Sequence, residues 1–267
     1  HFDGVDGNAL TLDSVVSTAP TVGGGDDAIT TGSGNDIIVG GDNAGVVDEK
    51  IAGGEGDNIV LGDNGQVIFH TGQLDLIESS EPGQGGRDVI TTGAGQDTIV
   101  AGFGSDQVAA DDGDNIVLGD NGEIDYTTGS GVLESLVSTS PGDGGGDQIT
   151  TGADSDIVIA GIGGDTVTAG NGDNIVVGDN GSIRFNGADG NPATLDEVKS
   201  TAPTSGGGDD KVTTGVGNDL VIGGLGGDII TVDDGDNVVL GDNGSVTMFG
   251  GLYWTPETGP LIKLDTK

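Results

Sequence analysis

Aspartate recurs along the chain at steps of eight or nine positions, and an aliphatic residue follows two positions after each aspartate. One stretch shows this pattern in full, with Asp88, Asp97, Asp106 and Asp114 preceding Ile90, Ile99, Val108 and Ile116. Two later stretches keep the same steps, with Asp147, Asp156, Asp165 and Asp173 and then Asp210, Asp219, Asp228 and Asp236. Carboxylates at a regular spacing are suitable ligands for a hard divalent cation. A solvated acidic face is the alternative, but solvation requires no fixed spacing.

The charge balance leaves two possibilities for the chain. The chain has 267 residues, with 45 Asp and Glu against 7 Lys and Arg, and a formal net charge of −38. Such self-repulsion expands a chain, so either the chain is a swollen coil or something cationic is part of the fold. The same charge excludes binding to nucleic acid or to an anionic membrane surface. Cysteine is absent and histidine occurs twice, which excludes disulfides and leaves little material for a zinc site or a catalytic triad.

Two sequence blocks each occur four times in the same order. The block GDNG stands at 62–65, 119–122, 178–181 and 241–244, and a Gly-Asp-rich block precedes it at 23–36, 85–97, 144–156 and 206–219. We divide the chain into repeat units at 1–65, 66–122, 123–181 and 182–244, followed by a C-terminal strand and cap or tail at 245–267. The first unit begins inside the repeat, so the chain is expected to continue N-terminally.

Each aspartate step contains only two to four β-favouring residues, such as Ile-Thr-Thr or Asn-Ile-Val-Leu, bounded by glycines. This pattern predicts very short strands separated by tight turns. A strand of that length is not stable alone in a sheet. Coiling the chain lets each turn pair with its neighbours and stacks one aliphatic residue per strand into a thin core. The sequence therefore predicts an all-β solenoid.

Several segments match a Gly-x-Gly-x-Asp-x-aliphatic pattern: TGSGNDII (31–38), TGAGQDTI (92–99), AGFGSDQV (101–108), TGVGNDLV (214–221) and GGLGGDII (223–230). The chain resembles the RTX family of calcium-binding nonapeptide repeats, found in large secreted bacterial proteins and adhesins. The resemblance implies a parallel β-roll or β-helix, with multiple Ca²⁺ ions between the turns. Aspartates of successive turns and backbone carbonyls of the glycine-rich loops would hold each ion.

Aspartates two steps apart are expected to share ions. The expected pairs are Asp88 with Asp106, Asp97 with Asp114, Asp147 with Asp165, Asp156 with Asp173, Asp210 with Asp228, and Asp219 with Asp236. The first unit adds Asp27, Asp36 and Asp57 as candidate ligands, with Asp48 or Glu49 at a shifted third step. The GDNG aspartates Asp63, Asp120, Asp179 and Asp242 are candidate ligands too. Turn formation is the alternative for them, because Asn-Gly favours a type I′ turn.

Four linkers align without gaps: LDSVVSTAP (12–20), LDLIESSEP (74–82), LESLVSTSP (133–141) and LDEVKSTAP (195–203). Each carries two apolar residues three positions apart. The spacing and the final proline predict a one-turn helix or a docked loop. The apolar pairs either cover an open flank of the solenoid or form a repeated recognition surface. Alternating strands are expected around four further pairs, Val67 and Phe69, Ile124 and Tyr126, Ile183 and Phe185, and Val246 and Met248.

These observations predict a calcium-folded structural or adhesive segment of a larger secreted bacterial protein that is not an enzyme. The resemblance implies type I secretion and an extracellular or cell-surface location. No run of apolar residues is long enough to span a membrane. Two alternatives remain open. One is a module that binds a carbohydrate, a cell-surface or matrix ligand, or ice through the linkers or through paired threonines such as Thr30-Thr31. The other is an accessory domain of an extracellular enzyme.

Overall fold

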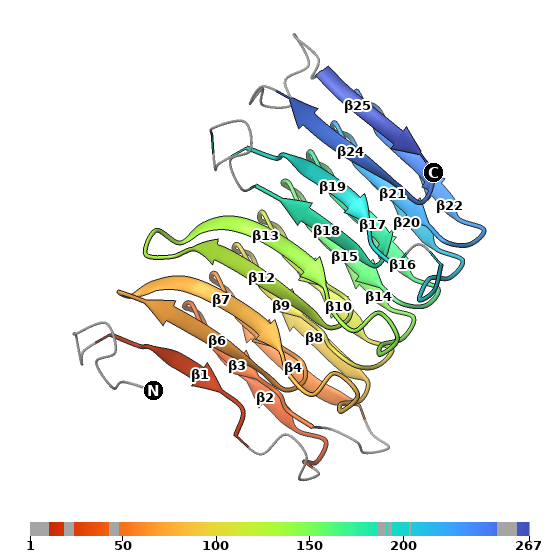
Figure 1. Cartoon of the computed structure of the whole chain (residues 1–267). Helices are drawn as coiled ribbons and strands as arrows, with labels where there is room; N and C mark the ends of the chain where they lie inside the picture. The colour runs from red at the N-terminus through yellow and green to blue at the C-terminus, as the bar shows by residue number, and fades with distance from the viewer. Residues whose placement is uncertain are drawn as a thin grey trace.

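The computed structural model describes residues 11–18, 24–42, 48–185, 191, 194–202 and 204–249, together with the backbone of 261–266. These residues form strands in three sheets (Figure 1). Within this part of the chain, no helix is long and apolar enough to cross a membrane. Phe2, at the N-terminal end where the chain is expected to continue, lies outside the described residues. Most of the 245–267 tail lies outside them too.

Two of the sheets are parallel and together form the roll. Roll sheet 1 contains β2 (Ala28–Thr30), β4 (Glu49–Gly54), β8 (Asp88–Thr92), β10 (Gln107–Ala109), β14 (Gln148–Thr150), β16 (Thr166–Thr168), β20 (Lys211–Thr213) and β22 (Ile229–Thr231). Roll sheet 2 contains β3 (Ile37–Val39), β5 (Ile59–Leu61), β9 (Thr98–Val100), β11 (Ile116–Leu118), β15 (Ile157–Gly161), β17 (Ile175–Asp179), β21 (Leu220–Gly224) and β23 (Val238–Asp242). The chain alternates between the two sheets, and each repeat unit contributes two turns.

The third sheet is antiparallel, and we call it the hairpin sheet. It contains β1 (Ser14–Val16), β6 (Gly65–His70), β7 (Gln73–Ser79), β12 (Gly122–Thr127), β13 (Val132–Ser138), β18 (Gly181–Arg184), β19 (Glu197–Ser200), β24 (Gly244–Phe249) and β25 (Leu261–Thr266). After two turns of roll the chain leaves roll sheet 2, adds a hairpin to this sheet and returns to the roll. Figure 1 shows the hairpins side by side in front of the parallel strands.

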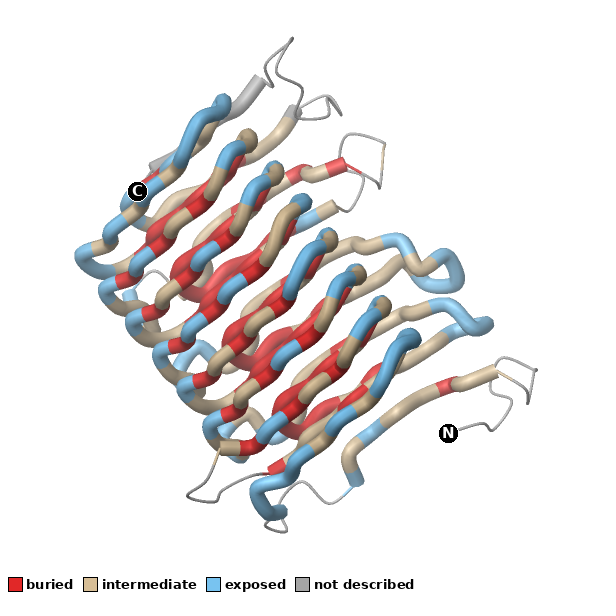
Figure 2. Tube along the Cα trace, turned by 180° about the vertical axis from the view of Figure 1, so that it is seen from behind, coloured by how far each residue is buried: buried red, intermediate tan, exposed pale blue. Residues whose placement is uncertain are grey.

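The prediction of a solenoid of short, coiled strands is confirmed. Its core is a column of aliphatic residues between the two roll sheets, and Ile90, Ile99 and Val108 are fully buried in it or nearly so. The alternation of buried and exposed positions along these strands is visible from behind (Figure 2). Each strand inserts one central side chain into the column, and parallel pairing sets it against its equivalent on the next turn.

The prediction of the inward residue is wrong at every eight-residue step. Val117 faces the column and pairs in register with Ile99, whereas Ile116 lies on the other face of roll sheet 2 and packs toward the hairpin sheet. Val176 likewise replaces Ile175 in the column. The reason is that the repeat keeps its nine-residue step here, with asparagine in place of aspartate. Counting two positions on from Asp114 therefore gives a residue one position before the one that faces the column.

The linkers are strands, so the expected one-turn helix or docked loop is wrong. β7 pairs with β6 through Ile68↔Leu76 and then Phe69↔Leu74, which leaves Asp75 as the extra residue of a β-bulge. A bulge shifts the alternation of side chains by one position. Leu74 and Ile77 therefore face the same side despite their spacing of three, which in a regular strand would place them on opposite faces.

The apolar linker residues cover a flank of the roll, as one interpretation expected. Ile77, Leu136 and Val198 are fully buried between the hairpin sheet and the outer face of roll sheet 2. The expected alternating strands are confirmed as β6, β12 and β18, each before a linker, and β24 after the last one, and Val67 and Ile124 enter the same second core. The molecule is thus three layers with two cores, because burying both faces of roll sheet 2 requires a third layer.

This packing predicts the effect of truncating one hairpin residue. Leu136→Ala should lower the free energy of unfolding by about 2–5 kcal/mol, since it opens a cavity in the second core. Val132→Ala is the matched control, because Val132 lies on the same strand and is 37% exposed. Urea denaturation of the calcium-loaded chain measures both. Equal losses in the two variants would contradict the burial described here.

Candidate metal centre

Polar residues form two ladders along the two edges of the roll, at the start of every parallel strand. The carboxylate edge is the ladder at the entry to roll sheet 1, and it consists of Asp27, Glu49, Asp88, Asp106, Asp147, Asp165, Asp210 and Asp228. The Asx edge is the ladder at the entry to roll sheet 2, and it consists of Asp36, Asn58, Asp97, Asn115, Asp156, Asn174, Asp219 and Asn237. Parallel in-register pairing stacks each member of a ladder on the next.

Backbone hydrogen bonds connect neighbouring members of the carboxylate edge. In each case the Oδ1 of one aspartate accepts the N–H of the aspartate on the adjacent turn. The donor–acceptor pairs are Asp88–Asp106 (2.8 Å), Asp106–Asp147 (2.7 Å), Asp147–Asp165 (2.7 Å), Asp165–Asp210 (2.8 Å) and Asp210–Asp228 (3.0 Å). Three of these are expected pairs, and the other two continue the ladder across unit boundaries. Glu49 takes the shifted step of the first unit, in register with Asp88.

The second carboxylate oxygen of this edge is buried without a hydrogen-bond partner. This holds for Oδ2 of Asp106, Asp147, Asp165 and Asp210, which are at most 3% exposed, and for both oxygens of Glu49. A buried, unpartnered charged oxygen is costly. The arrangement therefore needs positive charge or protons beside these oxygens.

The electrostatics of the edge agree with this requirement. Burial, reinforced by the charges of neighbouring carboxylates, raises the pKa of Asp147 to about 11 and that of Asp165 to about 8. Burial raises the pKa of Asp106 to about 7, although the Arg87 guanidinium and a backbone hydrogen bond oppose the shift. The pKa of Asp210 also rises to about 7, again mainly through burial. Without a cation, several of these groups would hold protons at neutral pH.

The GDNG aspartates join this edge from the preceding unit, and we call Asp63, Asp120 and Asp179 the bridging aspartates. Asp120 accepts the Gly145 N–H with Oδ1 (3.0 Å) and the Ile162 N–H with Oδ2, so it connects the two loops of the next unit. Asp179 makes the equivalent bonds to Gly208 and Leu225. Burial and nearby carboxylates of the edge raise the pKa of Asp63 to about 10 and that of Asp120 to about 9.

The type I′ turn offered as the alternative for GDNG is wrong. Such a turn requires positive φ at both central residues, and neither Asn64 nor Gly65 has it. The segment instead carries the chain from roll sheet 2 to the hairpin sheet. Asn121 Nδ2 binds the Pro82 and Asp143 carbonyls, so GDNG ties adjacent units together. Asp242, in the last GDNG, is exposed.

Asparagine, which the sequence reading missed, occupies alternate positions of the Asx edge. Asp97, Asp156 and Asp219 donate their N–H groups to the Oδ1 of Asn115 (3.1 Å), Asn174 (3.1 Å) and Asn237 (2.8 Å). The expected partners Asp114, Asp173 and Asp236 are exposed on the outer side of the loops, as is Asp57. The nine-residue step from Asp106 to Asn115 was the available signal, since asparagine has the shape of aspartate.

Calcium at the carboxylate edge would be held by side chains together with backbone oxygens, and not by side chains alone. Within the described residues, no three His, Cys, Asp or Glu side chains converge to hold a metal by themselves. Calcium also takes backbone carbonyl ligands, and the glycine loops of this edge bring carbonyls close together. Gly104 has φ +151°, and a Cβ there would lie 2.1 Å from the Gly86 oxygen. Only glycine permits this approach.

The raised pKa values predict how the metal-free chain responds to pH. Because folded Asp106, Asp147 and Asp165 hold protons that the unfolded chain releases above its ordinary pKa of 3.8, stability falls as pH rises from about 4 through the folded pKa values of about 7, about 8 and about 11. Circular dichroism in chelator should show β-structure at the lower pH that is lost at the higher. Asp147→Asn should weaken this dependence, whereas Asp114→Asn should not. Stronger β-signal at the higher pH would contradict the assignment.

Comparison with known protein families agrees with the geometry. A family model described as RTX calcium-binding nonapeptide repeat (4 copies) matches residues 21–47, 48–67, 82–117, 141–176 and 204–230, more than half of the chain. The matched segments contain most of the roll strands and their loops and leave out most of the hairpin sheet. A search of curated proteins finds no match. The chain belongs to the RTX calcium-binding nonapeptide repeat family.

Proposed function

We propose that this chain is a calcium-folded structural segment of a larger secreted bacterial protein, serving as an adhesive or spacing rod. The observation that carries the proposal is the series of buried Oδ2 atoms without partners along the carboxylate edge. Family membership supports calcium as the cation and a structural, non-catalytic role. The stacked, quasi-one-dimensional architecture suits a segment that can be extended by adding units.

The proposed ligands are the carboxylate-edge residues together with the loop carbonyls and the bridging aspartates. When bound, calcium supplies positive charge and coordination for oxygens that no protein donor reaches. The chain's own residues do the rest. Asp106 and Asp147 present one oxygen each to a backbone N–H, which fixes the carboxylate plane. The other oxygen of each stays buried without a hydrogen-bond partner, available to a cation.

Coupling between binding and folding follows from this arrangement. Neighbouring carboxylates of the edge come together only when the strands pair, so the site does not exist in the unfolded chain. Binding free energy is therefore folding free energy. We infer that the chain remains unfolded where free calcium is low, as inside a bacterium, and folds after export. Type I secretion and a cell-surface location are parts of this proposal.

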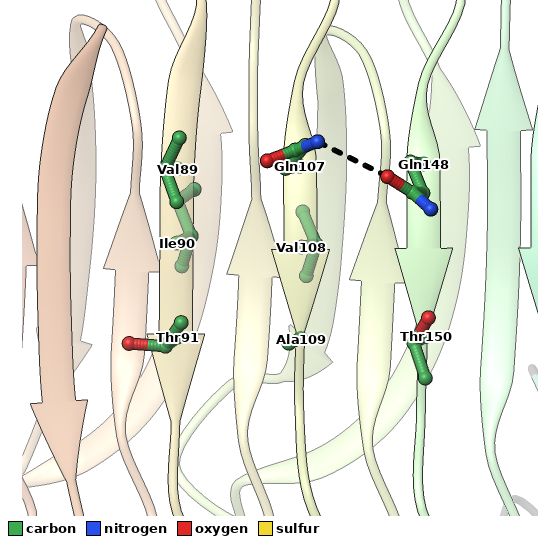
Figure 3. Close-up of a pocket in the computed structure, with 8 residues that line it drawn as sticks. All are labelled: Val89, Ile90, Thr91, Gln107, Val108, Ala109, Gln148 and Thr150. Carbon is green, nitrogen blue, oxygen red and sulfur yellow. Dashed lines mark hydrogen bonds between the residues drawn. The ribbon is translucent and has the colours of Figure 1, made fainter.

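A second candidate, a ligand-binding face, is favoured by the outer surface of roll sheet 1. Six of its eight strands place a threonine at the same outward position: Thr30, Thr91, Thr150, Thr168, Thr213 and Thr231. Ala52 and Ala109 interrupt the row. Ala109 lines a shallow pocket together with Gln107 and Gln148, and Gln107 Nε2 donates to Gln148 Oε1 there (3.1 Å; Figure 3). The linkers offer less, since their key apolar residues are buried.

Substituting the outward threonines separates the two candidates. Thr150→Val and Thr168→Val should leave calcium-dependent folding unchanged, because both side chains point away from the column. Binding to bacterial cells or glycans, measured with the folded chain, should also persist if the segment is a structural rod. Loss of such binding with folding intact would instead favour the ligand-binding face.

Chelation tests the main proposal. At neutral pH, excess chelator should convert the circular dichroism spectrum from β-sheet to coil, and added Ca²⁺ should restore it. Mg²⁺ at the same concentration should restore less, because it needs a small octahedral site and dehydrates reluctantly. A chain that remains equally β-rich in chelator would defeat the proposal.

A further inference from the structure

The asparagines of the Asx edge each bind the loop that precedes them. Nδ2 of Asn115 donates to the Asp111 and Gly113 carbonyls at 2.9 Å each. Asn58 and Asn174 bind the carbonyls four and two positions upstream in the same way, at 2.8–3.1 Å. Asn237 binds one of the two, at Asp233. The same amide motif thus recurs once in every repeat unit.

On the Asx edge these bonds use the amide nitrogen of asparagine as a donor. At the equivalent position the carboxylate edge has a carboxylate oxygen without a hydrogen-bond partner. On both edges, one side-chain oxygen accepts the N–H of the adjacent turn. The remaining atom is Oδ2 in Asp106 but Nδ2 in Asn115. The amide carries partial positive charge and donates to two loop carbonyls, which are the kind of oxygen that calcium takes as a ligand. An ion at this position would have to displace hydrogen bonds that already exist.

The aspartates of the Asx edge differ from one another. Thr214 Oγ1 donates to Asp219 Oδ2 (2.7 Å), whereas Oδ2 of Asp97 and Asp156 is buried without a hydrogen-bond partner, like the second oxygens of the carboxylate edge. Asn58 Nδ2 also donates to Asp97 Oδ1 (3.0 Å). Thr31, Thr92, Thr151 and Thr214 occupy the position five residues upstream of the four aspartates of this edge.

The carboxylate edge lacks both devices. The position five residues before its aspartates holds glycine, alanine or serine in Gly83, Ala101, Gly142, Ala160, Ser205 and Gly223. No asparagine alternates with its acids, so every turn from Glu49 to Asp228 adds a carboxyl group. Two edges with the same backbone arrangement therefore differ in charge and in available donors.

We propose that calcium binds along the carboxylate edge alone, and that the Asx edge is a metal-free seam in which the asparagine amides occupy the place of the ions. This proposal rests on the proposed calcium-dependent function and restricts where its sites lie. The chain then binds about half the ions that two equivalent edges would hold. The seam also provides a calcium-independent contact between turns.

Matched isosteric substitutions on the two edges test this proposal in the full chain. Asp106→Asn with Asp165→Asn removes charge from the carboxylate edge, and Asp97→Asn with Asp156→Asn removes equal charge from the Asx edge. Native mass spectrometry and calorimetric titration with CaCl₂ count the bound ions. The first pair should lower the count and raise the calcium concentration at the folding midpoint. The second pair should keep the wild-type count.

Each result has a defined meaning. If the Asx-edge pair loses as many ions as the carboxylate-edge pair, the metal-free seam is overturned while calcium binding stands. If the wild-type chain binds no calcium at all, the proposed function itself fails. Should the carboxylate-edge pair fail to fold, single substitution of Asp165 supplies the same comparison with single substitution of Asp156.

The reverse substitution provides an independent measurement. Asn115→Asp replaces the donating amide with a carboxylate facing the Asp111 and Gly113 carbonyls. At saturating calcium, the variant should melt at a lower temperature if the new carboxylate is protonated or strained. If a new ion replaces the amide, the variant should bind one ion more than wild type. An unchanged melting temperature together with an unchanged ion count would overturn the proposal.

Discussion

Repulsion among buried carboxylates is the constraint on which the whole structure depends. Pairing the short strands in register brings acidic side chains of successive turns together and removes them from water. The hydrophobic column is one aliphatic side chain wide. Burying it stabilises the fold only if the repulsion among the carboxylates is also relieved. The pKa of Asp147, raised to about 11, expresses how strongly the folded arrangement disfavours the charge when no cation is present.

The molecule solves this problem differently at its two edges. The carboxylate edge keeps its acids, leaves one oxygen of Asp106, Asp147, Asp165 and Asp210 unpartnered and adds the bridging aspartates, which is an arrangement suited to cations. The Asx edge replaces half of its acids with asparagine, whose amides bind the loop carbonyls, so it carries half the charge of the other edge. The hairpin sheet is a separate device, because it buries the second face of roll sheet 2 and allows a row of aliphatic residues there.

Much of this arrangement could be predicted from the sequence, because it follows from local periodicity. The four units, the short coiled strands, the stacking of Asp88 on Asp106 and the column residues that follow a nine-residue step follow from spacing. Three features were not predicted. Asparagine at 115 takes an aspartate position, and a search limited to carboxylates missed it. The bulge at Asp75 produces a spacing of apolar residues that resembles the spacing in a helix. It depends on pairing with the partner strand, which the spacing does not reveal. The hydrogen bonds of Asp120 to the next unit depend on where the hairpin brings the chain back to the roll.

The most direct test of the account is the position of the ions in the folded protein. Crystals grown with calcium, measured at a wavelength where calcium scatters anomalously, would locate each ion without reference to the protein. The account predicts anomalous peaks beside the second oxygens of Asp106, Asp147, Asp165 and Asp210, with none along the seam of Asn115. Carboxylate-edge side chains turned toward bulk water, with no peak between the turns, would contradict it.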